Sequence, residues 1–199
     1  IAGDVKPEDI LARVKKYFGD IPPGPTLIKP EVNVAKRNED TRGYYEDHVP
    51  EARITMEWNV PQWGSKEAVL LDLATDILSS GKTSRLYKKL VYEDQTASSA
   101  YAYLDQREIS SNFVVEASVK PGKTVEEVEA TMNAIVKEFL EKGPTQEELD
   151  RVRSNYFSNF LKGIERIGGF GGKSDILATN EVYGGSPDYY KTTLKNVSD

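Results

Sequence analysis

The sequence has 199 residues, which suits one sizeable domain or one domain with an appendage. Hydrophobic residues make up 38% and charged residues 29%, so the chain can bury a core and keep a polar surface. A net charge of −6 argues against a nucleic-acid-binding protein, because such proteins usually carry a basic face. No apolar run approaches the roughly 18 residues of a membrane span, so we expect no membrane segment.

Cysteine is absent from the sequence, which excludes disulfides, thiolate metal sites and cysteine nucleophiles. Its absence leaves the compartment open, and the bacterial periplasm and the cytoplasm both remain candidates. The chain begins at Ile1 without a visible signal peptide. Because residues 1–4 resemble the end of a strand that enters a helix, we expect this sequence to begin inside a larger protein.

A short helix is expected near the start of the chain. Pro7 suits the first turn of a helix, and apolar residues between positions 10 and 18 recur at helical spacing. The proline-rich residues 21–25 can continue neither a helix nor a central strand. The chain stays polar and irregular beyond them, so we interpret residues 21–42 as an interdomain linker.

The second unit is expected to begin near Gly43 and to contain paired strands and paired helices. Apolar residues at every second position of 53–60 indicate a strand with one buried face. Ser65 can cap the following helix, and Gly81 can stop it. Strands are predicted at 44–48, 53–60, 97–104 and 112–119, and helices at 65–79 and 83–91.

Two capping boxes mark further helices, one at Thr124 with Glu127 and one at Thr145 with Glu148. The first helix should end at Gly143 and the second near Gly163. Two more helical segments are expected at 172–183 and 187–194. Strands in adjacent pairs and helices in pairs favour an α+β fold, with a largely antiparallel sheet covered on one face by helices.

The residues argue against a complete catalytic site in this chain. His48 is the one histidine, and Pro50 would break a helix there, whereas a zinc peptidase motif needs two histidines on one helical turn. We therefore interpret residues 48–51 as a turn and predict neither catalytic residues nor metal ligands. Without cysteine or a second histidine, no cofactor is expected in the chain itself.

A glycine-rich stretch at residues 168–174 ends in Gly172-Lys173-Ser174, like a phosphate-binding loop. That motif also needs a glycine at the position of Ile167, and it should follow a strand rather than a helix. We therefore interpret the stretch as a break between two helices and as a potential hinge.

Four segments occur in an order that is shared with a known family. They are Gly3-Asp4-Val5 with the helix that leads to residues 17–22, the glycine-containing loop and S-R-L-Y helix start at 79–87, the G-P-T-x-x-E-L start at 143–149 and the segment at 184–190 with its G-x-P-x-Y turn. Together they resemble the insulinase-type (pitrilysin, inverzincin) zinc metallopeptidases, and they cover most of the chain. The resemblance is to the non-catalytic domain of that family.

The resemblance implies the pitrilysin or mitochondrial-processing-peptidase-like fold and a division of the chain into three parts. Residues 1–20 would be the tail of a preceding metal-bearing domain and residues 21–42 the linker. Residues 43–199 would be the non-catalytic domain, truncated before its last helix and strand. The implied function is to form the peptide-binding chamber of a zinc-dependent endopeptidase whose zinc lies elsewhere in the parent protein.

The implied partners are an unfolded peptide or polypeptide, the metal-bearing domain and a second homologous half or subunit. Many substrate-gripping domains of the family carry an arginine and a tyrosine seven residues apart, but the corresponding positions here are Val91 and Ser98. Arg85 and Tyr92 have that spacing by accident, because Arg85 belongs to the S-R-L helix. The family's chamber-facing loop instead suggests Gly81, Lys82 and Arg85 as substrate-binding residues.

Two alternatives remain open from the sequence. Lys82 and Arg85 are both donors that need no deprotonation to meet a peptide carbonyl or carboxylate, but Arg85 could instead pair with a carboxylate and brace the domain. The whole chain could also come from a structural, non-peptidase relative that acts as a subunit of a larger complex. An intact H-x-x-E-H motif upstream would favour the peptidase.

Overall fold

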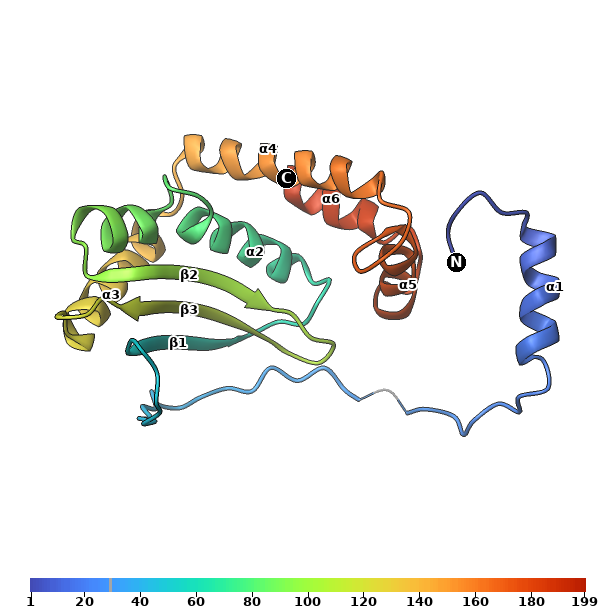
Figure 1. The fold of residues 1–199 in the computed structure, drawn as a ribbon, viewed down its shortest axis with the longest axis horizontal. Coiled ribbons are helices and arrows are strands. Elements are labelled where there is room, and N and C mark those ends of the chain that lie inside the picture. Colours follow the sequence, from blue (N-terminus) through green and yellow to red (C-terminus); the bar gives the residue numbers. More distant parts are fainter. Residues whose placement is uncertain (29) are drawn as a thin grey trace. The chain divides into compact units, whose positions relative to one another are not determined.

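The computed structural model describes residues 1–28 and 30–199 (Figure 1). The chain forms two compact units, one of Ile1–Glu31 with Ser158–Tyr190 and one of Val32–Phe157 with Lys191–Asp199. In chain order the elements are α1 (Pro7–Phe18), β1 (Arg53–Val60), α2 (Lys66–Ser79), the π-helix η1 (Tyr87–Glu93), β2 (Ala97–Asp105), β3 (Ser111–Val119), α3 (Val125–Lys142), α4 (Gln146–Ile164), α5 (Lys173–Gly184) and α6 (Tyr190–Ser198).

The larger unit is built on a three-stranded antiparallel sheet with the order β1-β3-β2. In its register, Val115 of β3 lies opposite Met56 of β1 and Ala102 of β2, so all three side chains point to the same face. Arg53, with the polar residues that alternate with this set, points to the other face. The strands predicted at 53–60, 97–104 and 112–119 are confirmed.

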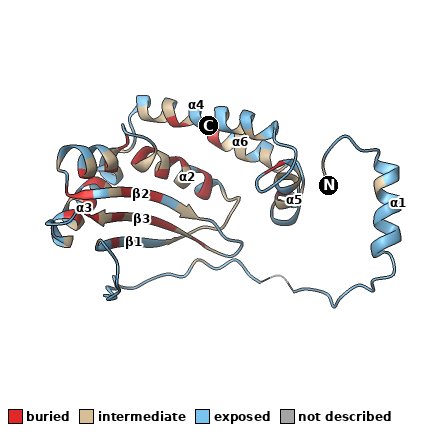
Figure 2. Ribbon diagram, viewed as in Figure 1, coloured by how far each residue is buried: buried red, intermediate tan, exposed pale blue. Residues whose placement is uncertain are grey.

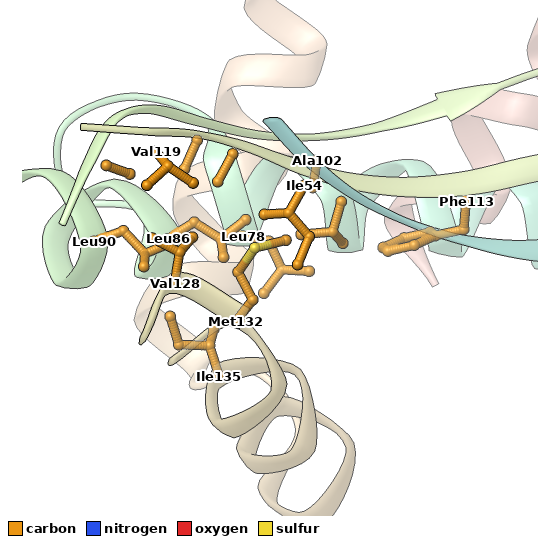
Figure 3. Packing of buried hydrophobic residues seen from close by; sticks show 14 residues of the cluster. Ile54, Leu78, Leu86, Leu90, Ala102, Phe113, Val119, Val128, Met132 and Ile135 are labelled. Carbon is orange, nitrogen blue, oxygen red and sulfur yellow. The ribbon is translucent and has the colours of Figure 1, made fainter. Parts of the chain in front are cut away.

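Helices α2 and α3 and the π-helix η1 cover the apolar face of the sheet (Figure 2). Met132 of α3 is fully buried, and its side chain lies among those of Leu78, Leu86 and Ile135 (Figure 3). This arrangement confirms the α+β fold with an antiparallel sheet covered on one face by helices. The core consists of Ile54, Leu78, Leu86, Leu90, Ala97, Ala100, Ala102, Phe113, Val115, Ala117, Val119, Val128, Met132 and Ile135.

A second apolar cluster holds α2 against α4 and α6. Val69, Leu73 and Ile77 of α2 pack with Val152 of α4 and Val197 of α6. Because α2 also packs on β2, this helix is buried on two sides and links the sheet to α4. Helix α2 leads directly into the loop at residues 80–84 and packs on α4. Its packing therefore places this loop beside α4.

Local sequence signals set the helix ends largely as expected. Ser65 accepts a hydrogen bond from the backbone N–H of Ala68 at 3.1 Å, as an N-cap residue should. Thr124 and Glu127 form the predicted capping box at the start of α3, with both hydrogen bonds at 3.2 Å. Lys142 is the last residue of α3, as predicted from Gly143.

Three predicted elements need correction. Residues 44–48 form no strand: Tyr44 and Tyr45 are 78% and 96% exposed, and no strand in the described part of the chain pairs with them. The helix predicted at 83–91 is mostly the π-helix η1, which extends to Glu93. The last helix begins at Tyr190 rather than at residue 187, because residues 187–189 form a turn.

In the smaller unit, α1 buries none of its residues. Leu11, Tyr17 and Phe18 of this helix are 54%, 70% and 62% exposed. Leu11, Val14 and Phe18 follow one another at helical spacing, so α1 presents an apolar stripe that makes no core within the described residues.

Candidate functional site

The loop at residues 80–84 connects α2 to η1 and carries two of the three predicted site residues. Gly81 has a φ of 81°, a left-handed conformation that glycine adopts without the cost paid by other residues. Its carbonyl accepts hydrogen bonds from the side chain and the backbone N–H of Ser84 at 2.7 and 3.2 Å. Because Ser84 is completely buried, the end of the loop is fixed to the core.

Lys82 lies at the exposed middle of this loop. Across the described residues, the ammonium group of Lys82 makes no hydrogen bond or ion pair, and the residue is exposed. Lys82 is therefore placed as a donor that an extended peptide could reach without displacing an existing partner.

Arg85 points the other way, into the body of the domain. Its guanidinium donates to both carboxylate oxygens of Glu148 at 2.7 Å and to the carbonyl of Gly143 at 3.0 Å. It also lies 5.1 Å from the centre of the Phe139 ring. With 18% of its side chain exposed, Arg85 has the geometry of the brace that the sequence left open as an alternative.

The electrostatics of this pair match its geometry. Hydrogen bonding from Arg85 lowers the pKa of Glu148 to about 2, with a further contribution from Thr145. The same contact raises the pKa of Arg85 above its ordinary value. Both groups stay charged across the physiological range, so the ion pair persists in any neutral buffer.

The entry to the loop is held by a residue that sequence reasoning missed. Arg151 of α4 donates from Nη1 to the carbonyl of Ser80 at 3.1 Å. Ser79 donates from its hydroxyl to the carbonyl of Ala102 on β2 at 2.9 Å. No local pattern relates Arg151 to a residue that lies 71 positions earlier, so only the packing of α2 against α4 reveals this contact.

Arg85 also forms part of the wall of a groove of about 520 Å³ between η1, α3 and the start of α4. Lys88 and Lys89 line it on the η1 side, and Glu138 and Lys142 on the α3 side. Most of its charges are already paired, as between Lys142 and Glu138 at 2.8 Å. Lys82 does not line this groove, so the structure separates the two charged residues that the sequence placed together.

His48, Tyr92 and Ser98 belong neither to the 80–84 loop nor to the lining of the groove. The backbone N–H of His48 donates to Asp47 within a turn, and its side chain is exposed. The hydroxyl of Ser98 donates to Glu51 at 2.6 Å. Tyr92 is 73% exposed, while Arg85 is occupied by Glu148.

The glycine-rich stretch lies between α4 and α5, as predicted for a break between two helices. Lys173 donates its backbone N–H to the carbonyl of Arg166 at 2.8 Å, which closes the loop at its base. Phe170 is 95% exposed at its tip. The stretch follows a helix and not a strand, which is the wrong context for a phosphate-binding loop.

Within residues 1–28 and 30–199, no cluster of three or more histidine, cysteine or acidic side chains could hold a metal ion. The same part of the chain contains no helix that is long and apolar enough to cross a membrane.

The family of the chain follows from its sequence. Residues 1–156 match the family described as the peptidase M16 inactive domain. The chain belongs to this family. The match covers both the N-terminal helix and the sheet with its covering helices, which confirms the resemblance to the non-catalytic domain of the insulinase-type zinc peptidases.

Similar proteins extend this finding. Zinc protease PqqE of Helicobacter pylori is 26% identical over 208 residues, which cover 100% of this chain and 46% of the relative. A crystal structure of a protease from Helicobacter pylori has a TM-score of 0.80 and 22% identity, covering 100% of this chain and 48% of that one. The crystal structure of the peptidase M16 inactive domain from Pseudomonas fluorescens has a TM-score of 0.73 and 17% identity. The similarity covers 98% of this chain and 45% of that one. The chain thus spans about half the length of these relatives.

Proposed function

We propose that this chain is the non-catalytic domain of a zinc-dependent endopeptidase and forms part of the chamber that binds its peptide substrate. The match of residues 1–156 to the peptidase M16 inactive domain carries this proposal. The similarity over the whole chain to a protein named a zinc protease supports it. The substrate in this proposal is an unfolded peptide or polypeptide.

The proposal includes a layout for the parent protein. Residues 1–20 close a preceding metal-bearing domain, residues 21–42 are a linker and residues 43–199 form the non-catalytic domain. The exposed apolar stripe of α1 supports this layout, because an amphipathic helix is normally stabilised by packing against a core. The partners are that metal-bearing domain and a second homologous half or subunit.

Zinc in this proposal lies elsewhere in the parent protein. The residues of this chain do not fit a catalytic zinc site, which uses three protein ligands rich in histidine. His48 is exposed, and no second histidine or cysteine exists to join it. No chemical step is therefore assigned to residues of this chain.

The candidate contact with substrate is Lys82, whose ammonium is exposed and unpaired among the described residues on a loop fixed at both ends. Gly81 supplies the left-handed turn that brings Lys82 to the surface. Arg85 serves this site indirectly, since its donors are engaged by Glu148 and Gly143.

A photo-crosslinking experiment on the full-length parent tests the proposal. A photoreactive amino acid replaces Lys82 in one variant and Lys137 in a control, since Lys137 is an exposed lysine of α3 at 75% side-chain exposure. With fluorogenic β-casein as an unfolded probe, we expect a crosslink at position 82 and none at 137. Equal labelling at both positions, or labelling at neither, would count against a chamber role for this loop.

A further inference from the structure

Glu148 and Arg151 lie about one turn apart on α4 and contact opposite ends of the 80–84 loop. Arg151 reaches the Ser80 carbonyl at the entry of the loop at 3.1 Å. Glu148 holds Arg85, the first residue after the loop, through two hydrogen bonds of 2.7 Å. The same turn of α4 therefore fixes both ends of the loop.

Glu148 has a second role that couples the loop to the start of α4. Its carboxylate accepts a hydrogen bond from the backbone N–H of Thr145 at 2.8 Å, which completes the predicted capping box. Arg85 reaches the same corner through the carbonyl of Gly143. The start of α4 and the exit of the loop therefore share one carboxylate and cannot move independently.

The contacts leave the middle of the loop as its free part. Ser80 and Ser84 are both held, whereas Lys82 has no side-chain partner in the described part of the chain. Binding groups are most precise when neighbouring residues lock their support on rigid elements. Two charged residues of α4 supply that support here.

We propose that Glu148 and Arg151 are positioning residues that hold the 80–84 loop so that Lys82 meets the peptide. The inference rests on the proposed function, in which Lys82 contacts substrate. It adds that substrate binding depends on two residues of α4 that need not touch the peptide.

The test uses Glu148→Gln and Arg151→Met in the full-length parent, beside Lys82→Ala. Glutamine can still complete a capping box, so Glu148→Gln removes the ion pair with Arg85 while keeping the helix start. Arg151→Met removes the contact with Ser80 and leaves the cap untouched. Glu141→Gln is the matched control, because Glu141 is an exposed glutamate of α3 whose ion pair is with Lys137 of the same helix.

Two measurements are made on each variant, hydrogen exchange of the backbone amides and steady-state cleavage of fluorogenic β-casein. The amides of Ser84 and Lys88 report on the loop, because they donate to Gly81 and Ser84 at 3.2 and 2.9 Å. We expect the amides of Ser84 and Lys88 to exchange faster in both α4 variants. We also expect KM to rise roughly tenfold with little change in kcat, because the lost contact would stabilise the bound substrate and the transition state equally. Glu141→Gln should change neither the exchange of these amides nor KM.

Unchanged exchange in both α4 variants would overturn the positioning role. Faster exchange with an unchanged KM would also overturn it, provided that Lys82→Ala raises KM. If Lys82→Ala leaves KM unchanged, the proposed contact of Lys82 with the peptide fails and the positioning role fails with it. The exchange data then still show whether the two contacts hold the loop, so the two failures are distinguishable.

Discussion

The guanidinium of Arg42 faces the carboxylate of Glu129 on α3 with two parallel hydrogen bonds of 2.7 Å. Arg42 also lies 5.3 Å from the centre of the Tyr44 ring. Ala35, seven residues before Arg42, is also held: its carbonyl accepts a hydrogen bond from the side-chain amide of Asn59 on β1 at 2.8 Å. The end of the proposed linker is therefore attached to the larger unit at two points.

The first prediction concerns this attachment. Trypsin must take the arginine side chain into its own pocket, so the contact with Glu129 should protect the bond after Arg42. Glu129→Gln should speed cleavage after Arg42, as followed by mass spectrometry, with the melting temperature unchanged. Glu126→Gln, at an exposed position of the same helix, is the control, and equal cleavage in both variants would show that the contact does not protect the linker.

The second prediction concerns Asp72 on α2. Burial, and secondly the charge of Asp76, raises its pKa from 3.8 to about 6. The folded state therefore binds a proton more tightly than the unfolded state does, and stability should fall as the pH rises from about 4 to about 6. Above that range the charged carboxylate should cost roughly 1–3 kcal/mol.

Asp72→Asn should therefore stabilise the chain by roughly 1–3 kcal/mol at pH 7 to 8. It should also flatten the dependence of stability on pH between about 4 and 6. Urea unfolding at a series of pH values measures both effects. Asp150→Asn, at an exposed position of α4, should leave the dependence of stability on pH unchanged. If the stability of Asp72→Asn varies with pH as that of the wild type does, the dependence does not come from Asp72.

A third prediction tests the packing between α3 and the sheet. Met132 is fully buried in the larger core, so Met132→Ala should lower the free energy of unfolding by about 2–5 kcal/mol. Leu140→Ala on the same helix should change it by less than about 0.5 kcal/mol, because Leu140 is 77% exposed. Similar losses in the two variants would contradict the arrangement of α3.

The fourth prediction separates the roles of the two charged residues that the sequence grouped together. Arg85→Ala removes a largely buried ion pair and should destabilise the chain by about 1–3 kcal/mol. Lys82→Ala should leave the melting temperature unchanged and act on KM alone. A fall in melting temperature for Lys82→Ala, or none for Arg85→Ala, would reverse this assignment.

Elements whose signals are local could be predicted from the sequence. The capping box of Thr124 and Glu127 and the alternation along β1 each depend on residues that are neighbours in the chain. The strand expected at 44–48 depended on a partner strand, and none pairs with it among the described residues. A short stretch with suitable residues forms no strand without such a partner.

The candidate site was only partly predictable for the same reason. The glycine turn and the exposed lysine follow from the local sequence, whereas the partner of Arg85 lies 63 positions away at Glu148. Glu148 was recognised as a capping residue, and its second role became visible only when α4 and the loop were placed together. The π-helical form of η1 gave no sequence signal distinct from that of an α-helix.

The strand order β1-β3-β2 also has a consequence for folding kinetics. β2 and β3 are joined by a short connection and can pair early. In the described sheet β1 pairs with β3 alone, which lies about 60 positions later in the chain. Closing so long a loop carries an entropic cost, so β1 should join the sheet late. During synthesis β1 leaves the ribosome long before its partner, and Arg53 and Glu57 on its polar face then help to keep an unpaired strand from associating with other chains.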